Sequence, residues 1–252
     1  MEAQTRLYRQ LCRLLRVDDA LMENSTNKKI YKASSVLHKQ YLLNAAIEAQ
    51  KIIDKAEVQN KYELMISIYN RKQKEHQVLV MLIQLFEVAI RTQAAVVLSD
   101  VYSSAGQDDL FFAADLNAKH RKLKQKIRNR AQLLNEVLTP ATSTIDMFNM
   151  LMMGDIQGIY KDHWSHLKHL FQNTTYKGNT ITPLHTKAMF DARFERIRVY
   201  RNSLFHGNPG HTGWRQVIRD IEEIMVQLQY NLSDTVNSID PHHRIITLQY
   251  RY

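Results

Sequence analysis

Apolar residues recur every three or four positions along most of the chain, which is the spacing of helices that bury one face. The first predicted helix covers residues 3–16, and four leucines line its apolar face: Leu7, Leu11, Leu14 and Leu15. A longer helical pattern runs from residue 31 to 68, with one break expected near residues 58–60. Residues 76–102 are apolar on almost every side, which predicts a central buried helix.

The same pattern continues through the second half of the chain. The predicted elements are, in order, a helix ended by Pro140, two helical pieces bent around Gly154, a loop over residues 172–183, a helix over 190–206 and a helix over 213–239. The last of these has the most regular apolar stripe: Trp214, Val217, Ile218, Ile221, Met225, Leu228, Leu232 and Val236. Residues 241–252 are expected to be basic and either strand-like or extended.

The pattern and the scarcity of helix breakers point to one fold class. Only 7 Gly and 4 Pro occur among 252 residues, which favours long helices over many short strands. We therefore predict an all-α protein built as a helical bundle. Its expected parts are an N-terminal helical layer over residues 1–72, which can belong to the same domain, a main helical domain over 73–240 and a tail over 241–252.

Composition limits the cellular compartments and the cofactors that we expect for this protein. The single cysteine, Cys12, lies on a leucine-rich helix, excludes an internal disulfide and leaves no cysteine-based zinc site. The most apolar segment, residues 78–90, is interrupted by Gln84 and Glu87 and is shorter than the roughly 20 apolar residues of a membrane span. We expect a soluble, cytoplasmic protein with no membrane partner and no cofactor.

The charge adds a candidate partner. A formal net charge of +9 favours a polyanionic partner, nucleic acid first and an anionic membrane surface second. Seven cations precede the first acid, Glu136, in one predicted helix: Lys119, Arg121, Lys122, Lys124, Lys126, Arg128 and Arg130. Because they point in many directions around the helix, most of this segment should be exposed. It is either a solvated face or a track for an RNA backbone.

Two further sets of polar residues can be structural or functional. Glu87 and Arg91 lie at positions i and i+4 of the central helix, so they can form a structural ion pair or belong to a site. His163, His166 and His169 recur every three residues, a spacing that can hold a metal ion. No acid or cysteine cluster accompanies these histidines in the sequence, so plain structural roles are favoured.

An arginine lies among the apolar positions of the helix over residues 190–206. At about 100° per residue, Arg201 falls about 20° from Phe190 on the helical wheel. The rest of the apolar stripe falls within about 60° of Phe190: Phe194, Ile197, Leu204 and Phe205. Because an unpaired guanidinium is costly to bury, Arg201 requires an acidic partner, a partner chain or a phosphate.

A polar edge lies beside this stripe. Arg198, Asn202 and His206 are spaced at i, i+4 and i+8, so they stack along one side of the helix. His206 lies in the final turn, before the helix-stopping residues 207–210, where the helix dipole favours its charged form. An arginine, an asparagine and a histidine at a helix end are suited to holding and protonating a phosphodiester.

These residues match a known motif. The segment RNSLFH, residues 201–206, fits the R-N-x-x-x-H motif of HEPN ribonucleases. Residues 85–93, with a Glu and an Arg, and residues 147–171, with an apolar run followed by Gly and Tyr, resemble segments of the Abi-like (abortive infection) branch of that superfamily. The three segments occur in the family's order, and the resemblance covers a little over half of the chain. The chain departs from the family at residues 207–209 and at Thr92.

The resemblance implies a HEPN-type bundle with additional N-terminal helices. It also implies a metal-independent endoribonuclease that works as a homodimer or higher homo-oligomer, with each site built from both copies. The 2′-hydroxyl of the RNA would attack the adjacent phosphorus and leave a 2′,3′-cyclic phosphate and a 5′-hydroxyl. His206 would be the general acid or base, Arg201 would stabilise charge on the phosphoryl oxygens, and Asn202 would orient the histidine or hold an oxygen. Arg198 would contact the RNA backbone.

Different functions remain open at this point. The resemblance implies a toxin or an antiphage-defence enzyme, held in check by an antitoxin protein or a small RNA. The alternative is a catalytically silent HEPN-like protein that binds RNA or a partner protein, and a weaker alternative is a regulatory bundle with no RNA role. In the silent case Arg201 can pair with a buried acid such as Glu87, and His206 can serve only as a helix cap.

Overall fold

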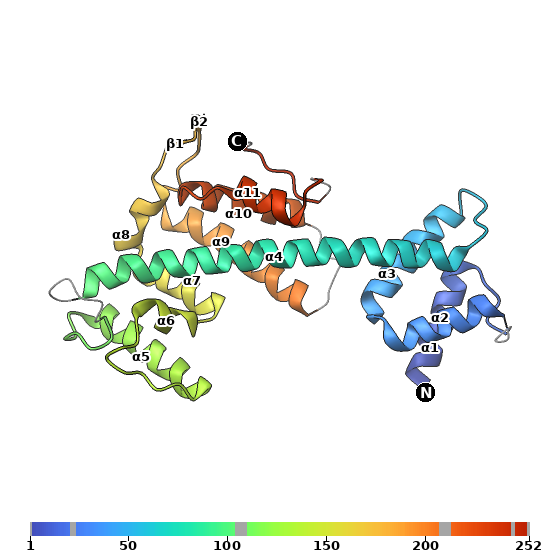
Figure 1. Ribbon diagram of the computed structural model, residues 1–252, viewed down its shortest axis with the longest axis horizontal. Helices are drawn as coiled ribbons and strands as arrows, with labels where there is room; N and C mark the ends of the chain where they lie inside the picture. The colour runs from blue at the N-terminus through green and yellow to red at the C-terminus, as the bar shows by residue number, and fades with distance from the viewer. Residues whose placement is uncertain (1, 21–23, 104–109, 207–212, 243–244, 251–252) are drawn as a thin grey trace. The chain divides into compact units, whose positions relative to one another are not determined.

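The computed structural model describes residues 2–20, 24–103, 110–206, 213–242 and 245–250. Apart from one short hairpin, all the regular secondary structure of these described residues is helical, which confirms the all-α prediction (Figure 1).

The chain forms two compact units. One, which we call the N-unit, consists of Met1–Val80 and Arg201–Thr212. The other, the C-unit, consists of Met81–Tyr200 and Gly213–Tyr252. The division passes through two continuous helices, α4 (Lys61–Tyr102) and α9 (Lys187–Phe205).

The N-unit packs three short helices with the first part of α4. These helices are α1 (Glu2–Leu15), α2 (Ser25–Val36) and α3 (Lys39–Ile53). Their buried side chains form one core with those of α4, including Leu7, Leu11, Leu15, Ile30, Leu42, Ala46 and Met65. The predicted leucine face of the first helix is therefore confirmed, and Cys12 is a core residue of the same cluster.

The helical stretch predicted over residues 31–68 is broken twice rather than once. The expected break lies between Ile53 and Lys61, and an unexpected one separates α2 from α3 at Leu37 and His38, whose backbones are extended. A tertiary contact holds this second break, because the backbone N–H of His38 donates to the hydroxyl of Tyr69 at 3.3 Å. No helix-breaking residue marks the site in the sequence.

Helix α4 is unbroken for 42 residues, or roughly 60 Å at 1.5 Å per residue. It joins the separately predicted helices, because the polar run of residues 71–77 holds only helix-compatible residues without Gly or Pro. This helix is long and apolar enough to cross a membrane by length and composition, with a mean hydropathy of 1.5 over 18 residues. A core helix passes the same test, and Phe86, Ile90 and Leu98 are buried here. Residues 78–90, which the sequence pattern marks as the most apolar segment, are shorter than this 18-residue apolar window.

The C-unit surrounds the second part of α4 with the remaining elements. They are α5 (Ala118–Leu134), α6 (Thr144–Asn149), α7 (Met153–Asp162), α8 (Trp164–Leu167), the 3-10 helix η1 (Lys168–Phe171), the hairpin strands β1 (Thr175–Tyr176) and β2 (Asn179–Thr180), α9, α10 (Trp214–Gln227) and α11 (Leu232–Ile239). The turn between the two antiparallel strands has positive φ at Lys177 and Gly178, as a tight two-residue hairpin requires.

Three predicted boundaries in the C-unit are wrong. Helix α5 stops at Leu134 rather than at Pro140, because Asn135 adopts the left-handed conformation that ends helices. The break expected at Gly154 precedes it, since Met152 caps α7 and its N–H donates to the Asp155 carboxylate at 3.1 Å. The helix predicted over residues 213–239 is two helices, separated by a turn in which Gln229 has positive φ.

Aromatic side chains form the centre of the C-unit core. The ring of Phe190 on α9 lies 4.7 Å from those of Tyr160 on α7 and Phe171 on η1, measured between centroids. Phe86 on α4 meets Phe194 on α9 at 5.7 Å. The hydroxyl of Tyr160, which is fully buried, donates to the carbonyl of Ile90 at 3.1 Å. These contacts bring α4, α7 and α9 together.

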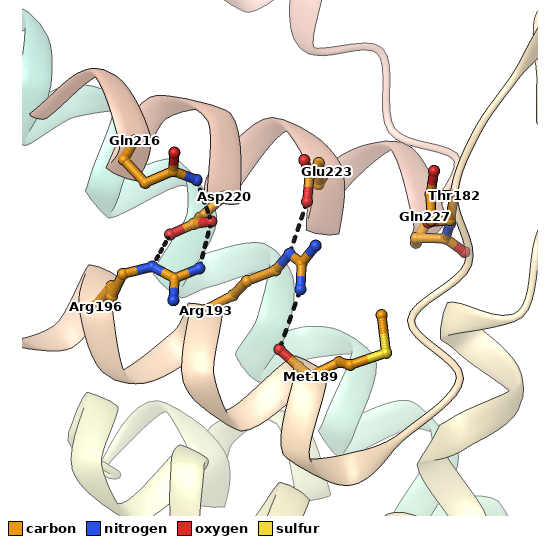
Figure 2. Close-up of polar contacts among 8 residues, drawn as sticks. All are labelled: Thr182, Met189, Arg193, Arg196, Gln216, Asp220, Glu223 and Gln227. Atoms are coloured by element: carbon orange, nitrogen blue, oxygen red, sulfur yellow. Dashed lines mark hydrogen bonds and ion pairs between the residues drawn. The ribbon is translucent and has the colours of Figure 1, made fainter. Parts of the chain in front are cut away.

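Two ion pairs hold α9 against α10 (Figure 2). Arg196 donates two hydrogen bonds to Asp220, at 2.7 and 2.9 Å, and Arg193 donates to Glu223 at 2.6 Å. Gln216 adds a hydrogen bond to Asp220, whose side chain is fully buried. The earlier arginine, Arg193, pairs with the later acid, Glu223, so the two helices run antiparallel where their polar faces meet.

Two buried carboxylates hold the chain after α11. The Asp240 carboxylate accepts the backbone N–H groups of Ile245 and Ile246, both at 2.8 Å. The Glu222 carboxylate accepts those of Gln249 and Tyr250 at 2.8 and 2.7 Å. The tail therefore has no strand partner in its described part but is attached through its backbone to acidic side chains.

Candidate functional site

The last turns of α9 carry the residues expected to be catalytic. As predicted, Phe190, Phe194, Ile197 and Leu204 are buried. Phe205 was also placed on the buried stripe, and this was wrong, because its side chain is 48% exposed. It is the last residue of the helix and lies at the outer edge of the stripe, so the core no longer covers it.

Arg201 is partly buried, as its place on the stripe requires, and it stacks on the exposed aromatic ring. Its guanidinium lies 4.4 Å from the ring centroid of Phe205, four residues later on the same helix. Its Nη1 also donates to the side-chain oxygen of Asn202 at 3.4 Å. The stacking holds the planar guanidinium at the helix end. This contact lowers the free-energy cost of placing a cation beside apolar residues.

His206 follows the helix directly. Its backbone N–H donates to the carbonyl of Asn202 at 3.1 Å, which continues the helical path by one residue, and its side chain is exposed. Residues 207–210, which were expected to stop the helix, lie outside the described residues. The end of α9 at Phe205 therefore leaves the imidazole of His206 accessible, with Arg201 and Asn202 within the preceding turn.

Arg198 is less available than expected for a backbone contact. Its guanidinium donates to both carboxylate oxygens of Glu195, at 3.1 and 2.6 Å, and this pairing raises its pKa. The pair is half-exposed, so its contribution to stability is at most about 1 kcal/mol. A phosphate would have to displace Glu195 in order to bind Arg198.

The Glu87–Arg91 pair forms as expected for a structural ion pair. The two side chains meet at 2.8 Å, and both are largely buried. Arg91 also donates to the carbonyl of Leu151 at 3.2 Å. The pair thus ties α4 to the connection between α6 and α7, a structural task in the C-unit.

The cations of α5 have acidic partners that the linear sequence did not indicate. Lys122 meets Asp162 at 2.6 Å, Arg130 meets Asp155 at 2.8 Å, and Lys126 lies 4.0 Å from Asp155. These cations share one side of the helix with Lys119, at positions i, i+3, i+7 and i+11. We call these four the α7-facing stripe, since both acids come from α7. The run of cations gave no sign of these partners, because the acids are distant in sequence.

The other three α5 cations, Arg121, Lys124 and Arg128, lie on a different side at positions i, i+3 and i+7. Lys124 is buried, an exception to the prediction that most of this segment is exposed. It donates to the carbonyl of Ala113 at 2.8 Å and pairs with Asp115 at 3.0 Å, and this contact lowers the pKa of Asp115. We call these three the loop-facing stripe, because they lie along residues 110–116. No ion pair within 4 Å joins Arg121 or Arg128 to an acid among the described residues.

The three regularly spaced histidines do not converge. His163 is 2% exposed, and its Nδ1 lies 3.1 Å from the hydroxyl of Tyr102. Burial lowers the pKa of His163 to about 4. His169 is exposed and bonds to the backbone carbonyl of His166 at 2.8 Å. Among the residues that the structure describes, no three histidine, cysteine or acidic side chains are arranged to hold a metal ion.

Two features near these residues were missed from the sequence. The acids of α7, Asp155 and Asp162, are seven residues apart and so share a face; that spacing matches the cations of the α7-facing stripe and could have indicated the pairing. Phe112, directly before the basic helix, is 45% exposed beside the buried Phe111. No periodicity could have distinguished these two phenylalanines, because they are adjacent in a loop.

Known proteins add no assignment to this geometry. Comparisons with models of protein families, with curated proteins and with solved structures found no match for this chain. The functional argument therefore rests on the side chains at the end of α9 and on the surface of α5.

Proposed function

We propose that this protein is a metal-independent endoribonuclease of the HEPN type, acting as a toxin or in antiphage defence. The observation that supports the proposal best is the turn at the end of α9. It combines an exposed imidazole from His206, a guanidinium from Arg201 held by stacking on Phe205, and the amide of Asn202. These are an acid–base group, a phosphate-binding fork and a positioning group.

The proposed reaction needs no metal because the nucleophile belongs to the RNA. The 2′-hydroxyl attacks the adjacent phosphorus, its proton passes to a base, and the bond from phosphorus to the 5′-oxygen breaks as that oxygen accepts a proton. His206 provides one of these proton transfers, and in a homodimer the second copy of the turn provides the other. Arg201 stabilises the negative charge that develops on the phosphoryl oxygens. The products are a 2′,3′-cyclic phosphate and a 5′-hydroxyl.

The alternative proposal is a catalytically silent protein of the same type that binds RNA or a partner protein. One observation favours it: the side-chain oxygen of Asn202 accepts from Arg201, and Arg198 is paired with Glu195. Three of the four expected site residues, Arg198, Arg201 and Asn202, are thus engaged with neighbours. In this case the same turn contributes binding without proton transfer.

The test is cleavage of a mixed RNA substrate in EDTA by the wild type, His206→Ala and Arg201→Ala. The chain offers matched controls: His169 is another exposed histidine, and Arg215 is another arginine stacked on an aromatic ring, 5.1 Å from that of Trp214. The nuclease proposal expects both motif variants to lose at least about a hundredfold in rate, with His169→Ala and Arg215→Ala unchanged. The wild-type products should carry 2′,3′-cyclic phosphates.

Other outcomes separate the two proposals. Cleavage that survives both motif substitutions contradicts the assignment of the site. A wild type that binds RNA in a salt-dependent manner without cutting it supports the silent alternative. Loss of cleavage in the control variants as well would indicate unfolding, which circular dichroism of each variant reports.

A further inference from the structure

The segment before α5 presents one aromatic ring to solvent. Phe112 is 45% exposed, whereas Leu110, Phe111 and Ala113 on either side of it are buried. A half-exposed phenylalanine forgoes part of the roughly 1.5–3 kcal/mol that its burial would contribute. The fold therefore directs the neighbours of Phe112 inward and leaves this ring outside.

Hydrogen bonds to α5 hold the backbone on both sides of Phe112. The Nε2 of His120 bonds to the carbonyl of Leu110 at 3.1 Å, and Lys124 donates to the carbonyl of Ala113 at 2.8 Å. The ring of Phe111 meets that of Phe112 edge to face, with centroids 5.1 Å apart. The backbone next to Phe112 is thus held on both sides and its ring packs against Phe111, which reduces the entropy that would be lost on binding a ligand.

Two guanidiniums lie close to this segment. Arg128 stacks on Phe111, with its guanidinium carbon 5.0 Å from the ring centroid, and its side chain is exposed. Arg121, also exposed, lies two turns earlier on the same stripe, near enough to Asp115 to help lower its pKa. The Asp115 carboxylate is engaged by Lys124 at 3.0 Å. The stripe therefore carries three cations against one acid among the described residues.

From this arrangement we propose that Phe112, Arg121 and Arg128 form a binding site for single-stranded RNA, in which a base stacks on Phe112 and the two arginines contact the flanking phosphates. The proposal rests on RNA being the substrate of the proposed function. An exposed aromatic ring beside cations is the combination that proteins use to bind unpaired nucleotides. In a duplex the bases are already stacked and cannot reach a single ring. The α7-facing stripe, whose charge is partly neutralised by Asp155 and Asp162, has a structural role instead.

Binding can be measured without cleavage by using a short fluorescent 2′-O-methyl oligoadenylate, which has no 2′-hydroxyl to attack. Phe112→Ala should weaken its binding by about tenfold, since stacking on an aromatic ring contributes roughly 1–3 kcal/mol per base. Phe112→Trp should restore binding. Arg121→Gln and Arg128→Gln should each weaken it and lower the salt dependence by about one phosphate contact.

Matched controls separate stacking from charge and from folding. Lys122→Gln removes a cation of the same helix that is paired with Asp162, and Leu133→Ala trims another exposed apolar side chain of α5; both should bind nearly as the wild type does. Inorganic polyphosphate, which has no bases, should bind Phe112→Ala and the wild type equally. Oligoadenylate annealed to its complement should lose its dependence on Phe112.

Three results would overturn the proposal. One is equal binding of oligoadenylate by Phe112→Ala and the wild type, and another is no binding by the wild type. The third is binding to phosphatidylserine vesicles but not to RNA, which would make this an anionic-membrane surface. The outcome is independent of the catalytic test: loss of binding in Phe112→Ala with no cleavage by the wild type refutes only the nuclease, and the reverse pattern refutes only this site.

Discussion

Lowering the pH from 7 to 5 is expected to cost the C-unit about 2 kcal/mol of stability through His163 alone. This side chain is buried between α4, α5 and α7, with its Nδ1 at 3.1 Å from the Tyr102 hydroxyl. Burial is the main cause that lowers its pKa to about 4, and the nearby charges of Lys119, His120 and His166 lower it further. Asp162 acts in the opposite direction.

The sign follows from which form the fold prefers. The unfolded chain binds the proton near pH 6.5, whereas the folded protein binds it near pH 4. The stabilisation is therefore complete above pH 6.5 and is lost as the pH falls toward 4. At about 1.36 kcal/mol per pKa unit the full loss is about 3 kcal/mol, of which about 2 kcal/mol has occurred by pH 5.

Urea unfolding followed by tryptophan fluorescence measures this loss, since Trp164 and Trp214 both belong to the C-unit. His163→Asn keeps a hydrogen-bonding atom near the position of Nδ1 but does not titrate. This variant should lose about 2 kcal/mol less than the wild type between pH 7 and 5, although it starts less stable. His169→Asn, at an exposed histidine, should lose as much as the wild type.

Other groups also titrate in this range, such as His76, whose pKa is also lowered by burial. Their contributions to the change in stability cancel when the variant is compared with the wild type. The reasoning is refuted if His163→Asn and the wild type lose the same stability between pH 7 and 5. That result would mean that His163 is hydrated in the folded protein. Direct titration of its imidazole by NMR would then place its pKa near the ordinary value for histidine.

Two further predictions concern the buried polar contacts of the C-unit, and urea unfolding at pH 7 tests both. Arg196→Ala should cost more stability than Asp220→Ala, about 3 against 1–2 kcal/mol. The first variant leaves a fully buried carboxylate whose remaining side-chain partner among the described residues is Gln216, whereas the arginine side chain is 47% exposed and can be hydrated when its acid is removed. Equal losses would contradict this reasoning. Tyr160→Phe should cost about 1 kcal/mol by removing its hydrogen bond to Ile90, and an unchanged stability would show that the hydroxyl contributes nothing.

The catalytic and RNA-binding proposals depend on different parts of the chain. The turn at the end of α9 is assigned the chemistry, and the loop-facing stripe of α5 is assigned the contact with an unpaired base. Because each has its own variants and its own readout, a protein that binds without cutting and one that cuts without using Phe112 can both be recognised.

Much of the fold follows from local pattern. The leucine face of α1, the apolar length of α4 and the stripe of Phe190 and Phe194 were readable because helical periodicity repeats within a single segment. The positions of the arginine and histidine at the end of α9 could be read in the same way. Local signals also predicted the Glu87–Arg91 pair, since its members are one helical turn apart.

Contacts between distant segments decided the rest. The break at His38 depends on Tyr69, the start of α7 on the capping carboxylate of Asp155, and the exposure of Phe205 on where the core ends. None of these is encoded by spacing along one helix.

The sequence by itself determined the all-α class, the main apolar faces and the residue types at the end of α9, because each of these depends on neighbours within a few turns. Only the tertiary structure decided which cations of α5 are already neutralised. The acids Asp115, Asp155 and Asp162 reach that helix from other elements. Charge interactions depend on distance in space and not on separation along the chain. The seven cations that look like one track in the sequence therefore form two stripes with different partners in the fold.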